Sequence, residues 1–311
     1  MRYATHVSEL IGHTPLMEVT SFPLPKDVRL FAKLEYFNPG GSVKDRLGKY
    51  LIERAMKEGK LQKGGTIIEP TAGNTGVGLA LAAIAFQIKT IFVTPEKFSL
   101  EKQSLMRALG STVVNTPTEQ GMEGAIAKTK ELLKTFPDAY YPGQFQNPAN
   151  PDTYYEGLGP EIYEAMDGKI DIFVAGAGSG GTFMGTSRYL KEKNPQIKTV
   201  IVEPEGSILQ GGEPRSHRTE GIGMEFMPPF LDTGYFDAIH TISDEIAFKR
   251  LAEAAVKEGL LVGSSSGAAL EASLLEAEKA QPGTHIVTVF PDSSERYISS
   301  GIYQEAGGHF K

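Results

Sequence analysis

Short apolar runs rich in valine and isoleucine alternate along the chain with longer segments whose apolar residues recur at the helical period. The runs expected to form strands are 29–35, 66–69, 90–94, 112–115, 170–175, 198–203 and 285–290. The segments expected to form helices are 43–59, 74–87, 99–109, 119–135, 153–167, 181–193, 245–258 and 266–280. Strands that alternate with helices in this way are typical of α/β proteins built on largely parallel sheets.

The length of 311 residues indicates two lobes, because one hydrophobic core rarely grows beyond about 250 to 300 residues. The stretch YYPGQFQNPANPD at 140–152 separates a first set of strand and helix units from a second, and is the expected boundary. Residues 204–240 lack clear periodicity. A loop of this length in a compact protein is usually functional or disordered.

Charge and composition narrow the class of ligand. The formal net charge is -7 and no cluster of Lys and Arg occurs, which argues against nucleic acid or an acidic membrane surface as partner. Cysteine is absent, which excludes disulfides and thiolate chemistry, and the six histidines are scattered, so no metal site is expected. No signal-peptide h-region or run of 18 apolar residues occurs. We expect a cytoplasmic protein that acts on small molecules.

One lysine stands where helix electrostatics disfavour it. The stretch NPGGSVKDR at 38–46 places Lys44 in the first turn of an expected helix, where the macrodipole favours acidic side chains. Lys44 therefore either points into water or has a chemical role.

A glycine-rich turn, GAGSGGT at 176–182, lies between a buried strand pattern and a helix. Gly176, Gly178 and Gly181 satisfy GxGxxG, and Glu203 follows Gly181 by 22 residues, which imitates a dinucleotide fingerprint. The more general inference is that such a turn lets backbone N–H groups bind a phosphate. A purely structural turn is the alternative.

Two further polar turns open helices. In EPTAGNTG at 69–76, Thr71, Asn74 and Thr75 offer more hydrogen-bonding groups than one N-cap needs, and this surplus suits a carboxylate. In GSSSGAALEA at 263–272 the serines are typical of caps or loop residues. Gln144, taken alone, is typical of an ordinary loop amide.

Taken together, the motifs NPGGSVKDR, EPTAGNTG, GQFQNPANP, GAGSGGT, EGIGMEF and GSSSGAA resemble those of the cysteine synthase and cystathionine β-synthase family, which are fold type II pyridoxal-phosphate enzymes. The resemblance runs from ELIGHTPL at 9–16 to PDSSERYISSGIY at 291–303. It implies an α/β fold like that of the tryptophan synthase β chain, with two three-layer αβα lobes and mostly parallel twisted sheets. The implied lobes are 36–148, with a mobile subdomain at about 88–134, and 1–35 plus 149–311.

The resemblance also assigns roles to individual residues. Lys44 would join the aldehyde of pyridoxal 5'-phosphate (PLP) as a Schiff base and later act as a base. Asn74 would bond the ring hydroxyl, and Ser265 would face the pyridine nitrogen. The cofactor phosphate would be cradled by Gly178, Ser179, Gly180, Gly181 and Thr182. The amino-acid substrate would be bound by Thr71, Ala72, Asn74, Thr75 and Gln144 around its carboxylate, and by Gly221, Ile222 and Gly223.

The implied reaction is a β-replacement on an activated serine, within reverse transsulfuration and cysteine biosynthesis. The segments 94–110, 203–209 and 220–232 resemble cystathionine β-synthases, which use homocysteine. Phe145 is the cysteine-synthase form, whereas serine-using cystathionine synthases have tyrosine there. Because acetate leaves without a proton and hydroxide does not, the donor is expected to be O-acetylserine. Ala72 stands where many relatives have serine, which removes one hydroxyl contact.

Three alternatives remain open at this point. A cysteine synthase would use sulfide in place of homocysteine. A nicotinamide-dependent dehydrogenase would explain the GAGSGG turn and Glu203, but not Lys44, Asn74 or Ser265. A non-catalytic binding relative is disfavoured because the lysine is retained. The resemblance further implies a homodimer.

Overall fold

The computed structural model describes residues 3–304, which divide into two compact units. Within these residues, the first unit comprises 3–11 and Asn38–Ala149, and the second comprises Gly12–Phe37 and 150–304. Residues 1–2 and 305–311, which the sequence assigns to the second lobe, lie outside the described residues. None of the helices in residues 3–304 is long and apolar enough to cross a membrane.

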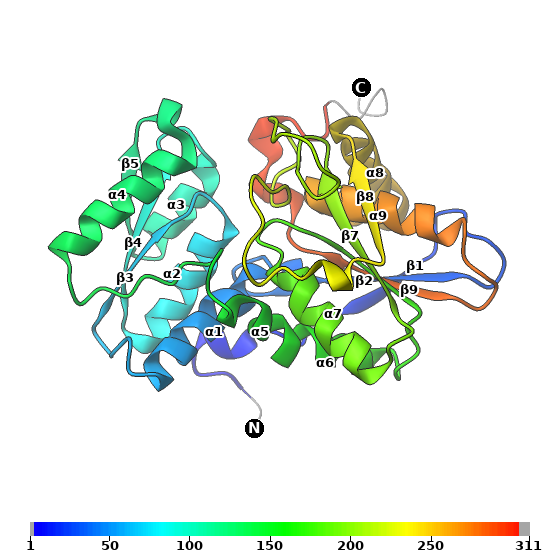
Figure 1. The fold of residues 1–311 in the computed structure, drawn as a ribbon, viewed down its shortest axis with the longest axis horizontal. Helices are drawn as coiled ribbons and strands as arrows, with labels where there is room; N and C mark the ends of the chain where they lie inside the picture. Colours follow the sequence, from blue (N-terminus) through cyan, green and yellow to red (C-terminus); the bar gives the residue numbers. More distant parts are fainter. Residues whose placement is uncertain (1–2, 305–311) are drawn as a thin grey trace. The chain divides into compact units, whose positions relative to one another are not determined.

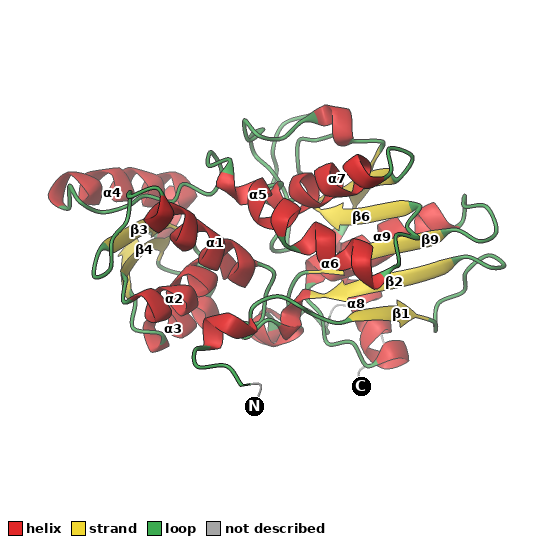
Figure 2. Ribbon diagram, turned by 90° about the horizontal axis from the view of Figure 1, so that it is seen from below, coloured by secondary structure: helices red, strands yellow, loops and turns green. Residues whose placement is uncertain are grey.

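The first unit is built on a three-stranded parallel sheet. Its strands lie in the order β3 (Thr66–Pro70), β4 (Lys89–Pro95) and β5 (Thr112–Thr116). Its helices are α1 (Lys44–Lys57), α2 (Asn74–Phe86), α3 (Leu100–Ala108) and α4 (Gly121–Thr135). Figure 2 shows α4 on one side of the sheet and α2 with α3 on the other. Ile68 and Val93 pack with Ala125 of α4 to form the core under that helix.

The N-terminal segment belongs to the first unit. Its short 3-10 helix η1 (Val7–Leu10) contacts α2, so residues 3–11 group with that unit, whereas the sequence assigned 1–35 to the other lobe. Residues 88–134, expected to move as a subdomain, form β4, α3, β5 and α4. Their movement stays a prediction.

Helices α1 and α2 meet through glycine. A Cβ atom on Gly48 of α1 would lie 2.3 Å from the carbonyl carbon of Gly78, and one on Gly78 would lie 2.3 Å from the carbonyl oxygen of Lys44. Real Cβ atoms do not approach backbone so closely, so both positions need glycine. The start of α1 is therefore held directly against the first turns of α2.

The second unit contains a six-stranded sheet. Its strand order is β1 (Leu16–Val19), β2 (Arg29–Leu34), β9 (His285–Phe290), β6 (Ile172–Gly176), β7 (Lys198–Pro204) and β8 (Ala238–Ile242), with only the pair of β1 and β2 antiparallel. Its helices are α5 (Ala149–Glu156), which begins at the boundary, α6 (Leu158–Ala165), α7 (Gly181–Lys193), α8 (Asp244–Glu258) and α9 (Ser264–Ala277). Figure 1 shows α8 and α9 on one side of this sheet and α6 and α7 on the other. The α/β class and the mostly parallel sheets are confirmed.

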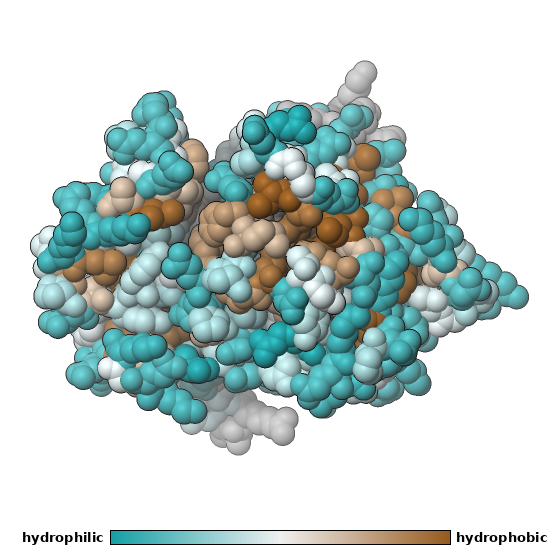
Figure 3. Space-filling model, viewed as in Figure 1, coloured by the Kyte–Doolittle hydropathy of each residue, from teal (hydrophilic) through white to brown (hydrophobic). Residues whose placement is uncertain are grey.

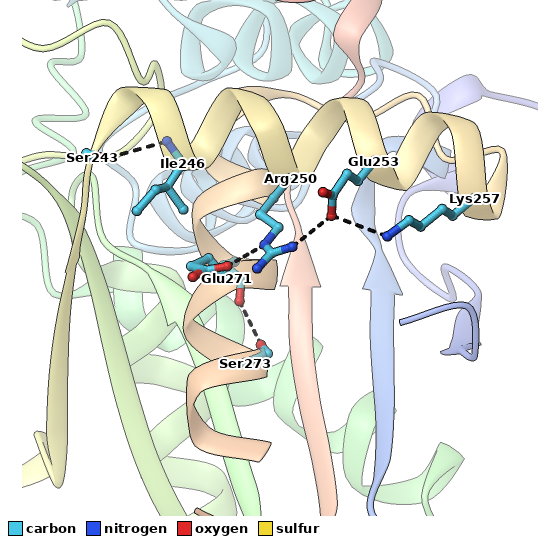
Figure 4. Close-up of polar contacts among 8 residues, drawn as sticks. Ser243, Ile246, Arg250, Glu253, Lys257, Glu271 and Ser273 are labelled. Atoms are coloured by element: carbon cyan, nitrogen blue, oxygen red, sulfur yellow. Dashed lines mark hydrogen bonds and ion pairs between the residues drawn. The ribbon is translucent and has the colours of Figure 1, made fainter. Parts of the chain in front are cut away.

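Helix α9 is fixed against α8 by a partly buried ion pair and a close backbone contact. Arg250 of α8 donates from Nε to Glu271 of α9 and from Nη1 to Glu253, 2.7 Å away (Figure 4). A Cβ atom on Gly267 of α9 would lie 2.0 Å from the carbonyl oxygen of Ala247. These contacts hold the serine-rich start of α9 in place.

All strands and helices expected from the sequence are present, with three differences. Strands β1 and β8 were not predicted, and the helix expected at 153–167 is divided into α5 and α6 at Gly157. Both missed strands are short and lie at the edges of the sheet, where most of their residues are only half-buried. They therefore lack the continuous apolar run that reveals a central strand.

The aperiodic region between β7 and β8 is the long loop that the sequence predicts. Within it the structure places one short 3-10 helix, Thr233–Tyr235. The loop is held by hydrogen bonds, including one of 2.9 Å from the N–H of Met224 to Ser207 Oγ. Phe226 and Met227 are exposed. Figure 3 shows apolar surface, in brown, on the face of the second unit that is turned to the viewer.

Candidate functional site

The predicted site residues fall into two sets, one in each unit. Lys44, Thr71, Ala72, Asn74, Thr75 and Gln144 belong to the first unit, and Gly178, Ser179, Gly180, Gly181, Thr182, Gly221, Ile222, Gly223 and Ser265 belong to the second. Within residues 3–304, no three or more His, Asp or Glu side chains are grouped so that they could hold a metal ion. Each set is described within its own unit.

Lys44 is the first residue of α1, as the sequence predicts, and is half-buried. Its N–H donates to Ser42 Oγ at 3.3 Å. The next residue, Asp45, is buried and accepts a hydrogen bond from the N–H of Gly40. The Asp45 carboxylate satisfies the preference of the helix N-terminus for negative charge. Lys44 is therefore not the residue that stabilises this helix start.

The turn between β3 and α2 is joined to Gln144 by a buried hydrogen bond. Thr75 Oγ1 donates to Gln144 Oε1 at 2.8 Å, across 69 residues of sequence. Thr71 Oγ1 accepts from the N–H of Gly73 at 3.3 Å, and Asn74 is the first residue of α2. Because Thr75 donates to the amide oxygen, this hydrogen bond fixes the orientation of the Gln144 amide. The structure thus brings Gln144 to the turn that carries Thr71, Asn74 and Thr75, and its role toward a carboxylate stays a prediction.

The glycine turn between β6 and α7 has the properties of a phosphate cradle. A Cβ atom on Gly178 would lie 2.4 Å from the carbonyl oxygen of Gly221, and Gly180 has φ +81°. Ser179 is buried, and its Oγ accepts from Asn150 Nδ2 at 3.0 Å. The first turn of α7 carries no acidic residue. Backbone N–H groups at such a helix start suit a phosphate dianion.

The loop around Gly221 lies against both the glycine turn and the start of α9. Glu220 donates its N–H to Ser264 Oγ at 3.0 Å, and a Cβ atom on Gly221 would lie 3.8 Å from Ser265 Oγ. Ile222 is buried in the core of the second unit. Gly178, Gly221 and Ser265 are thus neighbours, although they come from three distant segments.

Asp244 holds this loop and was not identified from the sequence. Its carboxylate accepts from the N–H of Arg218 at 2.6 Å, the N–H of Thr219 at 2.8 Å and Thr219 Oγ1 at 2.6 Å. Ser243 already caps α8, because its Oγ accepts from the N–H of Ile246 at 3.4 Å. A second cap-type residue directly after Ser243 was the signal that could have revealed the tether.

Glu203 does not occupy the position of a ribose ligand. It is buried, and its carboxylate accepts from the N–H of Leu209 at 2.8 Å, the N–H of Gln210 at 3.1 Å and Thr241 Oγ1 at 2.8 Å. The Glu203 carboxylate is therefore occupied by hydrogen bonds from the protein itself. The spacing that favoured a nicotinamide-dependent dehydrogenase is explained by loop anchoring.

The comparison with known families decides between these chemistries. A model of the family "Pyridoxal-phosphate dependent enzyme" matches residues 7–292. The chain belongs to this family. This PLP enzyme is 59% identical to the O-acetylserine-dependent cystathionine β-synthase of Bacillus subtilis strain 168 over 304 residues, which are 98% of this chain and 99% of the relative.

Two further relatives of this PLP enzyme, both from Helicobacter pylori, bear one of two names. The cysteine synthase of Helicobacter pylori strain ATCC 700392 / 26695 is 55% identical over 305 residues, which cover 97% of this chain and 100% of the relative. A crystal structure of O-acetylserine-dependent cystathionine β-synthase from Helicobacter pylori is 56% identical, with a TM-score of 0.93, and covers 97% and 100% of the two chains. The chain is an enzyme of the cystathionine β-synthase and cysteine synthase class with PLP as its cofactor.

The expectation that the glycine turn of this PLP enzyme holds the cofactor phosphate can be tested with Gly178→Ala. The added methyl would meet the carbonyl oxygen of Gly221, so one of the two loops must move. We expect the affinity for PLP to fall about 5- to 150-fold, as a strained contact of about 1 to 3 kcal/mol implies. Titration of the apoprotein with PLP measures it, and thermal unfolding of the apoprotein serves as control. A folded variant with wild-type PLP affinity would show that the loops tolerate a Cβ here.

Proposed function

We propose that the enzyme catalyses a β-replacement in which O-acetylserine and homocysteine give cystathionine. The observation that supports the choice of donor is the hydrogen bond between Thr75 and Gln144, because Phe145 directly follows Gln144 in the chain. Phe145 offers no hydroxyl that could protonate a leaving group, and acetate needs none. The name of the Bacillus subtilis relative supports the same donor.

In the first unit, the proposed roles belong to Lys44 and the carboxylate turn. When bound, PLP supplies the electron sink that weakens the Cα–H bond of the amino acid and allows loss of its β substituent. Lys44 Nζ would hold the cofactor by its aldehyde and, once the substrate amine has taken its place there, would remove the Cα proton as a free amine and later return it. Thr71, Thr75 and the amide of Gln144 bind the substrate carboxylate, together with the N–H groups at the start of α2. Ala72 contributes only its backbone there.

In the second unit, the proposed roles belong to the cradle and to Ser265. The N–H groups of residues 178–182 and the hydroxyls of Ser179 and Thr182 hold the cofactor phosphate. Ser265 would present a neutral hydroxyl to the ring nitrogen of the bound cofactor, so that the nitrogen would not need a proton and prompt loss of the leaving group would be favoured. The Gly221–Gly223 segment, which follows the Arg218 and Thr219 groups held by Asp244, would flank the amino-acid side.

The acceptor is proposed from the loop between β7 and β8. Its segments EPEGSIL and EGIGMEF resemble those of cystathionine-forming enzymes, which supports homocysteine. The second candidate, cysteine synthesis with sulfide, is supported by the name of the Helicobacter pylori relative. We also propose that the enzyme acts as a homodimer.

The four combinations of O-acetylserine or serine with homocysteine or sulfide test this proposal. We expect the highest kcat/KM for O-acetylserine with homocysteine, with cystathionine identified by mass spectrometry. Cysteine formation without detectable cystathionine would assign the enzyme to cysteine synthesis. Formation of neither product would refute β-replacement itself.

A further inference from the structure

A buried glutamate lies directly before the carboxylate turn. Glu69, in β3, has only 1% of its surface exposed. Its Oε2 accepts from the N–H of Gly143 at 2.9 Å, and its Oε1 accepts from the N–H of Gln144 at 3.2 Å. Glutamate is rarely buried this completely unless it has partners. Its partners here come from one turn, 74 and 75 residues further along the chain.

The same turn is fixed from both sides. Tyr140 exchanges backbone hydrogen bonds with β3, to Thr66 at 2.8 Å and from Ile68 at 3.0 Å, so the segment before the turn extends the sheet. At Gly143 the chain adopts φ +62° and leaves the sheet. Glu69 accepts the two N–H groups at this bend. The backbone of the turn therefore depends on Glu69, while the Gln144 side chain is oriented by Thr75 of α2.

We propose that Glu69 is a positioning residue for amino-acid binding. Its carboxylate holds the backbone of the Gly143–Gln144 turn, so that the Gln144 amide meets the substrate carboxylate in a fixed place. Glu69 does not touch the substrate and acts through Gln144. This inference rests on the proposed function, because it takes Gln144 as a ligand of the substrate carboxylate.

The electrostatics of Glu69 agree with this geometry. Burial raises the pKa of Glu69 to about 7, although the two backbone hydrogen bonds lower it in part. The titratable side chains on which its charge acts are Tyr140 and Tyr141, whose pKa values are raised mainly by burial and also by Glu69, that of Tyr141 to about 12. Both are neutral near pH 7, so neither compensates the charge. Protonation of Glu69 converts one acceptor of the turn into a donor.

Glu69→Gln tests the proposal, because the amide keeps the shape but can accept at only one end. Loss of a hydrogen bond to a charged group corresponds to a change of about 10- to 100-fold in a binding constant. We expect KM for O-acetylserine to rise by this factor, with kcat and PLP content within about twofold of wild type. Glu276→Gln, which alters a buried acid of the second unit paired with Lys198 and His240, is the matched control and should leave KM unchanged.

A double-mutant cycle distinguishes positioning from general support of the fold. If Glu69 acts through Gln144, Glu69→Gln should add nothing to KM in a Gln144→Ala background. Additive effects would overturn the proposal, as would a wild-type KM in folded Glu69→Gln. If Glu69→Gln does not fold, Glu69→Asp keeps the charge with a shorter reach and should show the same selective rise in KM. An inactive wild type would instead refute the proposed function.

The pH dependence provides a second readout. As pH falls below about 7, KM of the wild type should rise more steeply than KM of Glu69→Gln, since the substrate amine titrates alike in both. The free energy of unfolding should fall as pH rises, because the pKa of Glu69 is raised on folding. The contribution of Glu69 to stability is fully present below pH 4.5 and is lost as pH rises through 7. The Tm of the wild type should therefore fall relative to that of Glu69→Gln as pH rises from 4.5 through 7. Parallel KM profiles would contradict the proposal.

Discussion

Lys44→Ala should reduce turnover by more than about 10⁴-fold while the protein stays folded. A positioned general base alone is typically worth about 10² to 10⁴ in rate, and this variant also loses the amine that links to the cofactor. PLP should still bind through its phosphate, because the cradle lies in the other unit. Product formation from O-acetylserine and homocysteine, measured beside the PLP content, checks the result.

The matched control for this variant is Lys57→Ala, an exposed lysine in the last turn of the same helix, which should keep wild-type activity. Loss of activity in both variants would point to damage of α1 as a whole. Wild-type turnover in Lys44→Ala would end the proposed chemistry, because no other residue is assigned the link to PLP.

Phe145→Tyr should raise kcat/KM for serine by about 10²-fold or more without harming the O-acetylserine reaction. The new hydroxyl would belong to the residue after Gln144 and could protonate the departing hydroxide. Proton donation of this kind typically raises the reaction rate by about 10² to 10⁴. Steady-state kinetics with both donors and homocysteine measure the change in preference.

Phe136→Tyr adds the same hydroxyl at an exposed position of the same unit and should leave the preference unchanged. If the wild type already prefers serine, the argument from Phe145 is wrong. If Phe145→Tyr gains nothing with serine, the proton donor must be supplied elsewhere.

The sequence predicted the central elements and the polar turns well, because both leave local signals. Buried central strands are continuous apolar runs, and the glycines of residues 176–182 mark a place where backbone must approach backbone. Edge strands β1 and β8 leave weaker signals, since solvent replaces one neighbour. The motif order indicated the family, whereas single motifs left alternatives open.

The residues that sequence reasoning missed act through contacts between distant segments. Glu69 is held by N–H groups 74 and 75 residues away, and Asp244 by groups 25 and 26 residues away. Neither spacing follows a helical or strand period. Glu203 shows the converse, because its spacing imitated a nucleotide motif while its carboxylate anchors its own loop.

The glycine contact between α1 and α2 has a consequence for motion. Gly48 and Gly78 bring the backbones of α1 and α2 into direct contact, so we expect the start of α1 and the first turns of α2 to move together. Any displacement of this unit during turnover would carry Lys44 and the carboxylate turn together. The spacing between the proposed proton carrier and the proposed carboxylate site would then not depend on how far the unit moves.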